Sequence, residues 1–205
     1  MQGEGGKQEG APEPKQRLVL AAIACIERFG VGGVTSRRLA AEAGVNVSAV
    51  NYYFGSKAAL LDLALAETLR ATFDDPLAEF DQLLSQGATA QEALRHIVRE
   101  TLEGSLEYPK IAHAHLKSAV EEQRYDGAVV IAMNEFLAAL DKRLAKAGAG
   151  RSSKRRRARL AQVWGFICLQ AMAPELTRGY SRLDLHKAAD MSVYVDALLD
   201  GVFDA

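Results

Sequence analysis

The chain has 205 residues, a net charge of −1 and 49% hydrophobic residues, enough for one large or two small folded domains. No apolar run approaches the ~20 residues that a membrane-spanning helix needs. The two cysteines, Cys25 and Cys168, are far apart and make neither a disulfide framework nor a zinc motif. We therefore expect a soluble, cytoplasmic protein. Residues 1–14 carry no apolar core, which predicts a disordered tail and excludes a secretory signal.

The first predicted helix covers residues 18–29, where apolar residues recur at steps of three and four. Gly30 ends it, and a glycine-containing loop follows. Thr35 is then placed to cap a second helix, whose inner stripe is Leu39, Ala40 and Ala43. Gly44 follows this stripe, and glycine takes a left-handed backbone conformation without steric cost. The sequence therefore predicts a sharp corner at Gly44.

A further short helix follows this corner, with Asn46 or Ser48 as its cap. Val50 and Phe54 lie four residues apart and face inward, while the residues between them spread around the other sides. The combined spacing is typical of a helix-turn-helix; the alternative is an ordinary pair of short helices. Residues 15–60 hold six Lys or Arg and two Glu, a charge of +4 that suits a surface facing phosphates.

The rest of the chain, residues 61–205, predicts helix after helix, so the fold class is all-α. Ser56 is a natural cap for a long helix, Pro76 is expected to start another, and Thr89 caps one that Pro109 closes. Further helices are expected at about residues 111–120, 127–147, 161–173 and 185–203. A cationic run, Arg151, Lys154, Arg155, Arg156, Arg157 and Arg159, is interpreted as a solvated helix end and not as a nucleic-acid site.

Three segments in the first third of the chain resemble the tetracycline-repressor (TetR) family of bacterial transcriptional regulators. They are Ile-Glu-Arg-Phe-Gly at residues 26–30, Arg-Leu-Ala-Ala-Glu-Ala-Gly-Val at 38–45, and Tyr-Phe-Gly-Ser-Lys-Ala-Ala-Leu-Leu at 53–61. The resemblance covers about residues 15–65. It implies a homodimer with a DNA-binding domain at 15–60 and a helical body at 61–205 for dimerisation and for binding a small-molecule inducer.

Carried over residue by residue, the resemblance places DNA contacts at two helices and one lysine. Many family members have tyrosine where this chain has Asn51, so Asn51 is free to read adenine through its amide. Tyr52 or Tyr53 then takes the phosphate contact, and core packing of one of the two is the open alternative. The predicted DNA-binding residues are Thr35, Ser36, Arg37, Val47, Ser48, Ala49, Asn51, Tyr52, Tyr53 and Lys57, the last on phosphate.

In the body, the resemblance and the apolar pattern predict two more sites. The expected ligand-binding residues are Phe80, Leu102, His113, Met133, Phe136, Trp164 and Cys168, with plain core packing as the alternative. The expected dimer-interface residues are Trp164, Ile167, Tyr194 and Leu198. No metal or other cofactor is expected, because His113 and His115 are two residues apart and diverge on a helix.

The resemblance implies a sequence-specific homodimeric repressor that a small-molecule inducer releases from its operator. Three other functions are the alternatives. An activator, or a regulator without an inducer, fits the same residues. An enzyme is disfavoured because the sequence has no nucleophile elbow, phosphate-binding glycine loop or H-E-x-x-H motif. An architectural protein that coats DNA without sequence preference is disfavoured by the small charge excess.

Overall fold

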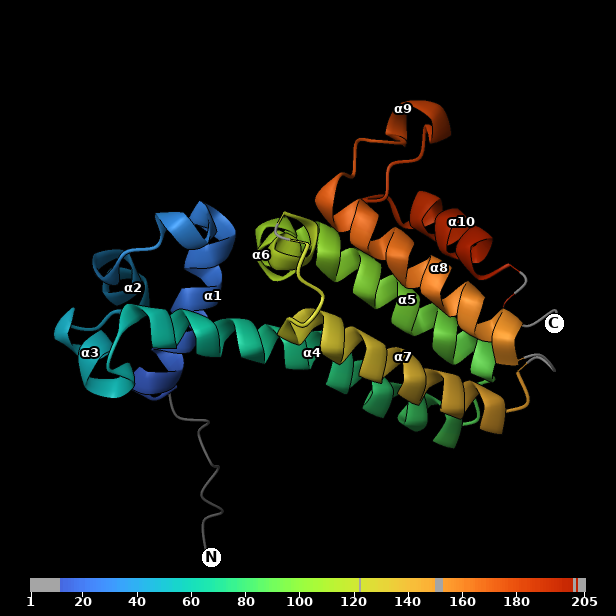
Figure 1. Ribbon diagram of the computed structural model, residues 1–205, viewed down its shortest axis with the longest axis horizontal. Coiled ribbons are helices and arrows are strands. Elements are labelled where there is room, and N and C mark those ends of the chain that lie inside the picture. Colours follow the sequence, from blue (N-terminus) through green and yellow to red (C-terminus); the bar gives the residue numbers. More distant parts are fainter. Residues whose placement is uncertain (1–11, 122, 150–152, 201, 203–205) are drawn as a thin grey trace, which may run out of the picture. The chain divides into compact units, whose positions relative to one another are not determined.

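The computed structural model describes residues 12–121, 123–149, 153–200 and 202. Every regular element among these residues is a helix (Figure 1), which confirms the predicted all-α class. The chain divides into two compact units, one ending at Ala64 and the other beginning at Leu65. Residues 1–11 of the predicted tail lie outside the described residues. No helix in the described part of the chain is long and apolar enough to cross a membrane.

The first unit consists of α1 (Pro14–Gly33), α2 (Ser36–Ala43), α3 (Ser48–Phe54) and the beginning of α4 (Lys57–Ser85). Helix α1 is interrupted at Gly30, whose φ of 68° is left-handed, at the residue where the sequence predicted a helix end. Its inner stripe packs against α2. Cys25 is buried in this stripe, and burial raises the pKa of its thiol, so it packs as a small apolar group. The buried residues of α1 are Leu18, Ala21, Ala22, Cys25 and Ile26.

The second unit, the body, contains the rest of α4 and six further helices. They are α5 (Ala90–Glu107), α6 (Pro109–Val120), α7 (Ala128–Lys146), α8 (Ser153–Met172), α9 (Arg178–Ser181) and α10 (Ala188–Leu199). Helix α8 packs against α5, α6 and α7, and α10 packs against α5. Among the largest fully buried side chains of this core are Phe80, Leu94, Ile97, Leu102, Leu140, Leu144, Leu160 and Met191.

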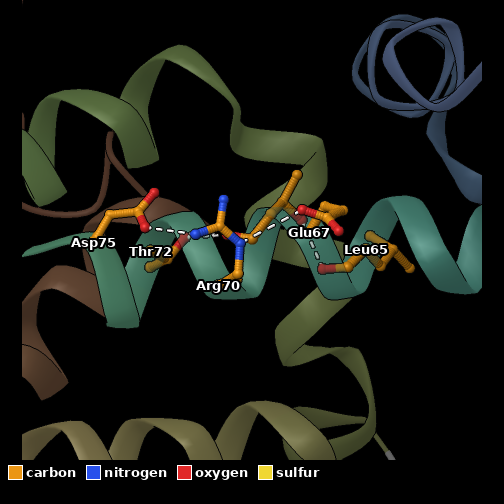
Figure 2. Close-up of polar contacts among 6 residues, drawn as sticks. Leu65, Glu67, Arg70, Thr72 and Asp75 are labelled. Carbon is orange, nitrogen blue, oxygen red and sulfur yellow. Dashed lines mark hydrogen bonds and ion pairs between the residues drawn. The ribbon is translucent and has the colours of Figure 1, made fainter. Parts of the chain in front are cut away.

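The predicted helix start at Pro76 is wrong, because α4 runs through it without interruption. Proline cannot donate the backbone hydrogen bond of its turn, which leaves one carbonyl of α4 without its helical partner. Packing of Phe73 and Phe80, on either side of Pro76, into the body core favours a continuous helix here. Figure 2 shows the exposed side of this segment, where Arg70 forms ion pairs with Asp75 at 2.7 Å and with Glu67 at 3.5 Å.

The cationic run at the start of α8 is mostly the solvated helix end that the sequence predicted, with one exception. Arg156 is 4% exposed. Its Nε donates to Asp141 Oδ1 on α7 at 2.6 Å, and its Nη1 donates to the Ala149 carbonyl at 2.8 Å. This residue therefore fixes α8 to α7 from inside the body. Arg151 lies outside the described residues.

A partly buried histidine, His115, links α6 to α4 in the body. The Nε2 atom of His115 lies 2.9 Å from Oγ1 of Thr68, and that hydroxyl donates its own hydrogen to the Leu65 carbonyl. Nε2 is therefore the donor of the pair, and the ring is neutral. Burial lowers the pKa of His115 to about 4.

This low pKa predicts a loss of stability in acid. In the unfolded chain His115 is protonated below about pH 6.5, whereas in the folded chain it is protonated only below about pH 4. The unfolding free energy is therefore expected to fall by about 2–3 kcal/mol from this residue alone between pH 6.5 and pH 4. Urea unfolding of the wild type and His115→Gln at pH 7 and pH 4.5 checks this. The variant should lose less stability on acidification than the wild type, and an equal loss would contradict the assignment.

Candidate nucleic-acid interface

The corner between α2 and α3 is fixed by local backbone chemistry. Oγ1 of Thr35 accepts a hydrogen bond from the Arg38 N–H at 3.3 Å and so caps α2, as predicted. Gly44 ends α2 with a φ of 62°, and its N–H bonds back to the helix carbonyls. The N–H of Val45 also reaches the Ala40 carbonyl, at 2.9 Å. These bonds turn the chain within three residues and start α3 at a defined angle.

Helix α3 begins with Asn46 as its capping side chain. Oδ1 of Asn46 accepts from both the N–H and the hydroxyl of Ser48, at 3.0 and 2.9 Å. Of the two caps that the sequence left open, Asn46 takes the role, and Ser48 is its donor. Val50 is the buried residue of this short helix, and Gly55 ends it with a positive φ of 73°. The other sides of α3 are left for contacts outside the unit.

Most of the predicted DNA-binding side chains are exposed. Tyr52 is 82% exposed and Tyr53 is 38% exposed, so neither lies in the core, and their rings meet edge to face at 4.9 Å. Asn51 is exposed, so both the oxygen and the nitrogen of its side-chain amide are accessible. Amides can read base edges, and hydroxyls can bond phosphate oxygens. The exposed members of the predicted set are Thr35, Arg37, Val47, Ser48, Asn51, Tyr52 and Tyr53; Ser36, Ala49 and Lys57 are partly buried.

The lysine predicted to grip phosphate has a structural role as well. Nζ of Lys57 donates to the Val34 carbonyl at 2.8 Å and so connects the end of α1 to the first residue of α4. An ammonium group has three N–H donors, so two remain for a phosphate oxygen. Ser56 caps α4 beside it, because its Oγ accepts from the Ala59 N–H at 3.1 Å. The positive end of the α4 dipole adds to the charge of Lys57 at this position.

The arginines of the first unit divide into those that form contacts within the unit and those that face outward, a division that the sequence does not show. Arg38 donates to the Gly33 carbonyl, and its guanidinium stacks on the ring of Phe29 at 4.3 Å. Arg28 pairs with Glu42 at 3.2 Å. Arg37 is exposed next to Arg38. Neighbouring residues on a helix point about 100° apart, so the structure assigns Arg38 to the fold and leaves Arg37 for a ligand.

The comparison with known proteins agrees with this geometry. The sequence model described as "Bacterial regulatory proteins, tetR family" matches residues 18–64. The match begins within α1 and runs to the end of the first unit. The first unit of the chain therefore matches the TetR family. Members of this family are transcriptional regulators and not enzymes.

Similar proteins extend the TetR-family match beyond the first unit. The chain is 34% identical over 89 residues to the transcriptional dual regulator CecR of Shigella flexneri, covering 42% of this chain and 40% of CecR. It is 33% identical over 113 residues to the regulator BetI of Agrobacterium fabrum, covering 55% and 53%. The chain thus spans about half the length of these relatives or less. The multidrug binding protein EbrR, in complex with malachite green, has the same fold at 23% identity, with a TM-score of 0.61 over 94% of this chain and 99% of EbrR.

The body brings together part of the predicted ligand-binding set. The ring of Phe136 lies 5.0 Å from that of Trp164 and 5.6 Å from that of Phe73, in a core that also contains Phe80 and Leu102. Met133 packs at its edge. Nε1 of Trp164 is buried without a hydrogen-bond partner among the described residues. These side chains form a packed aromatic core around one unsatisfied donor.

The other two predicted ligand-binding residues stand apart from this core. The side chain of His113 is 61% exposed and lies 3.8 Å from Glu121. Cys168 is partly buried on α8, and burial raises the pKa of its thiol. His113 therefore does not line the interior of the body. Among the described residues, no group of three or more His, Cys, Asp or Glu is arranged to hold a metal ion.

The predicted dimer-interface residues are divided between the core and the surface of the body. Trp164 and Ile167 are 2% and 4% exposed, so they face the chain's own core and not a partner. Tyr194 and Leu198 on α10 are partly exposed. The outward side of α8 is displaced by about one residue from the predicted stripe. The residues that α8 and α10 leave exposed or partly exposed here include Ala161, Gly165, Phe166, Leu169, Val193 and Ala197.

Proposed function

We propose that this chain is a cytoplasmic, homodimeric repressor that binds a near-palindromic operator and leaves it when a small molecule binds the body. The observation that carries the DNA-binding part is α3, which buries Val50 and exposes Ser48, Asn51 and Tyr52 after a fixed corner. Asparagine can bond both exposed edge atoms of adenine, and serine and tyrosine hydroxyls can bond phosphates. The family match over residues 18–64 supports the same assignment.

The apolar outer side of α8 and α10 supports the homodimer. Val193 is 58% exposed, and the small residues Ala161 and Gly165 on α8 leave room for close approach of another helix. The rings of Phe166 on α8 and Tyr194 on α10 lie 5.1 Å apart, so apolar residues of the two helices adjoin here. An exposed apolar surface typically marks a protein interface. A two-fold axis here would present two α3 helices to half-sites about 34–36 Å apart along the DNA.

A protein of the same fold supports the small-molecule inducer. EbrR, which has this fold, was solved with malachite green, so a body of this architecture can hold a small molecule. A ligand releases the operator only if it binds the conformation with low DNA affinity more tightly than the other. The second candidate function is an activator or dual regulator, which the name of CecR favours. The position of the operator relative to the promoter decides between these two.

Three substitutions in the first unit test the assigned roles. We expect Asn51→Ala and Arg37→Ala to relax preference at particular base pairs, each by about 1–3 kcal/mol. Lys57→Ala should weaken binding to all sequences alike, because phosphates carry no sequence information. Titration of each variant with a panel of single-base operator mutants measures this.

Lys142→Ala, an exposed lysine on α7, is the matched control for the loss of one positive charge. Because Lys57 also bonds the Val34 carbonyl, the unfolding midpoint of Lys57→Ala must be measured beside its affinity. If all three variants of the first unit bound every operator of the panel with uniformly lower affinity, this division of roles would be refuted.

A further inference from the structure

A hollow opens on the body between the end of α5 and the segment that joins α8 to α10. Its volume is about 440 Å³, and Leu106, Leu185 and Met191 form its apolar side. A smaller hollow adjoins it and shares Leu106, Leu185 and His186 in its lining. We call the two together the α5–α10 hollow. Its size is in the range of small-molecule sites, which are mostly apolar with a few polar groups.

A buried amide faces this hollow with poor hydrogen bonds. Gln170 is 2% exposed and lines the smaller part. Its Nε2 lies 3.4 Å from the hydroxyl of Tyr194 and 3.5 Å from that of Thr177. Good N–H···O bonds are about 2.9–3.0 Å long. A buried amide with such long bonds gains free energy when a ligand supplies a closer partner.

Most carboxylates at the hollow already have a cation beside them. Glu103 pairs with Arg99, Glu175 with Arg178, and Asp184 with Lys187, which leaves Glu107 as the remaining carboxylate of the lining. Glu107 is the last residue of α5 and is exposed. Tyr108 flanks both the end of α5 and the beginning of α6, so the two helix dipoles offset each other there and the carboxylate of Glu107 sets the charge. The field in the hollow therefore favours a positive charge close to Glu107.

We propose that the α5–α10 hollow binds a small organic cation with an apolar skeleton. Its ammonium group lies at the carboxylate of Glu107, and its skeleton covers Leu106, Leu185 and Met191. Gln170 and Tyr194 are available for any polar group at the other end. The inference rests on the proposed function, because it names the site and ligand class through which an inducer would act. It places this site outside the aromatic core around Phe136.

The test uses three ligands of one shape and different charge: phenethylamine, phenethyl alcohol and hydrocinnamate. Calorimetric titration into the purified full chain, without DNA, is expected to give binding of the amine at least about fivefold tighter than the alcohol, with the carboxylate weakest. Glu107→Gln should remove most of the preference for the amine. Glu135→Gln, an exposed carboxylate on α7 outside the hollow, is the control and should keep that preference.

A second variant tests the location. Ala188 is exposed and lines the larger part of the hollow, so Ala188→Trp should fill it and weaken all three ligands. Equal affinity for the three ligands, no binding of any, or binding unchanged by Ala188→Trp would overturn the proposal. Because the titration contains no DNA, such a result would not bear on the proposed binding of the operator. Failure to bind any operator would instead overturn the proposed function while leaving ligand binding measurable.

Discussion

Arg156→Ala is expected to lower the unfolding free energy of the protein by about 3–5 kcal/mol, the typical cost of removing one partner from a buried ion pair. The guanidinium is 4% exposed and connects Asp141 on α7 to the Ala149 carbonyl. Its removal leaves the partly buried Asp141 carboxylate, whose side chain is 18% exposed, without this counter-charge and opens a cavity beside it. Urea unfolding at pH 7, followed by circular dichroism, measures the change.

The matched control is Arg159→Ala, three residues further along α8, where the side chain is exposed. This change should cost less than about 0.5 kcal/mol. The double variant Arg156→Met with Asp141→Leu replaces the pair by apolar groups and should recover most of the lost stability. Equal effects of Arg156→Ala and Arg159→Ala would show that the pair does not act as a buried link.

Gly165→Glu is expected to raise the dissociation constant of the proposed dimer about a hundredfold. Gly165 is exposed on α8, and a Cβ built there meets no atom within 4 Å, so the single chain has room for the new side chain. In a two-fold dimer through α8 and α10 the two new carboxylates would meet across the axis, desolvated and of like charge. Sedimentation at several protein concentrations measures the constant.

Gly179→Glu is the control for this substitution, because Gly179 is also exposed with open space around its Cβ but lies on α9. It should leave the dimer intact. The loss of dimerisation in Gly165→Glu should also lower operator affinity, because a single first unit makes half of the DNA contacts. A Gly165→Glu protein that remains dimeric would move the interface away from α8.

The elements that sequence predicted best are those fixed by neighbouring residues. Thr35, Gly44 and Thr89 act within one turn of their own positions, and each is found in the predicted role: two caps and a left-handed helix end. The side chain and backbone of Thr89 even exchange bonds with Glu92 in a capping box. Such bonds need no knowledge of the tertiary fold, so their residue types and spacing are sufficient.

The features that sequence missed depend on what packs against each residue. Pro76 reads locally as a helix start, but the burial of Phe73 and Phe80 keeps α4 continuous through it. Arg156 belongs to a run of cations, and its contact with the Asp141 carboxylate of α7 depends on how α7 and α8 pack. Similarly, the outward side of α8 differs from the predicted side by a rotation of about one residue, which apolar spacing alone cannot resolve.

Selection of bound sequences from a random duplex pool, with the purified full chain at near-physiological salt, tests the central claim most directly. A homodimeric helix-turn-helix protein should enrich a near-palindrome whose half-sites are about one helical turn apart. Asn51→Ala should select a site that is degenerate at one position in each half, with the spacing unchanged. Enrichment of no sequence, by a sample that native mass spectrometry shows to be free of small molecules, would contradict the account.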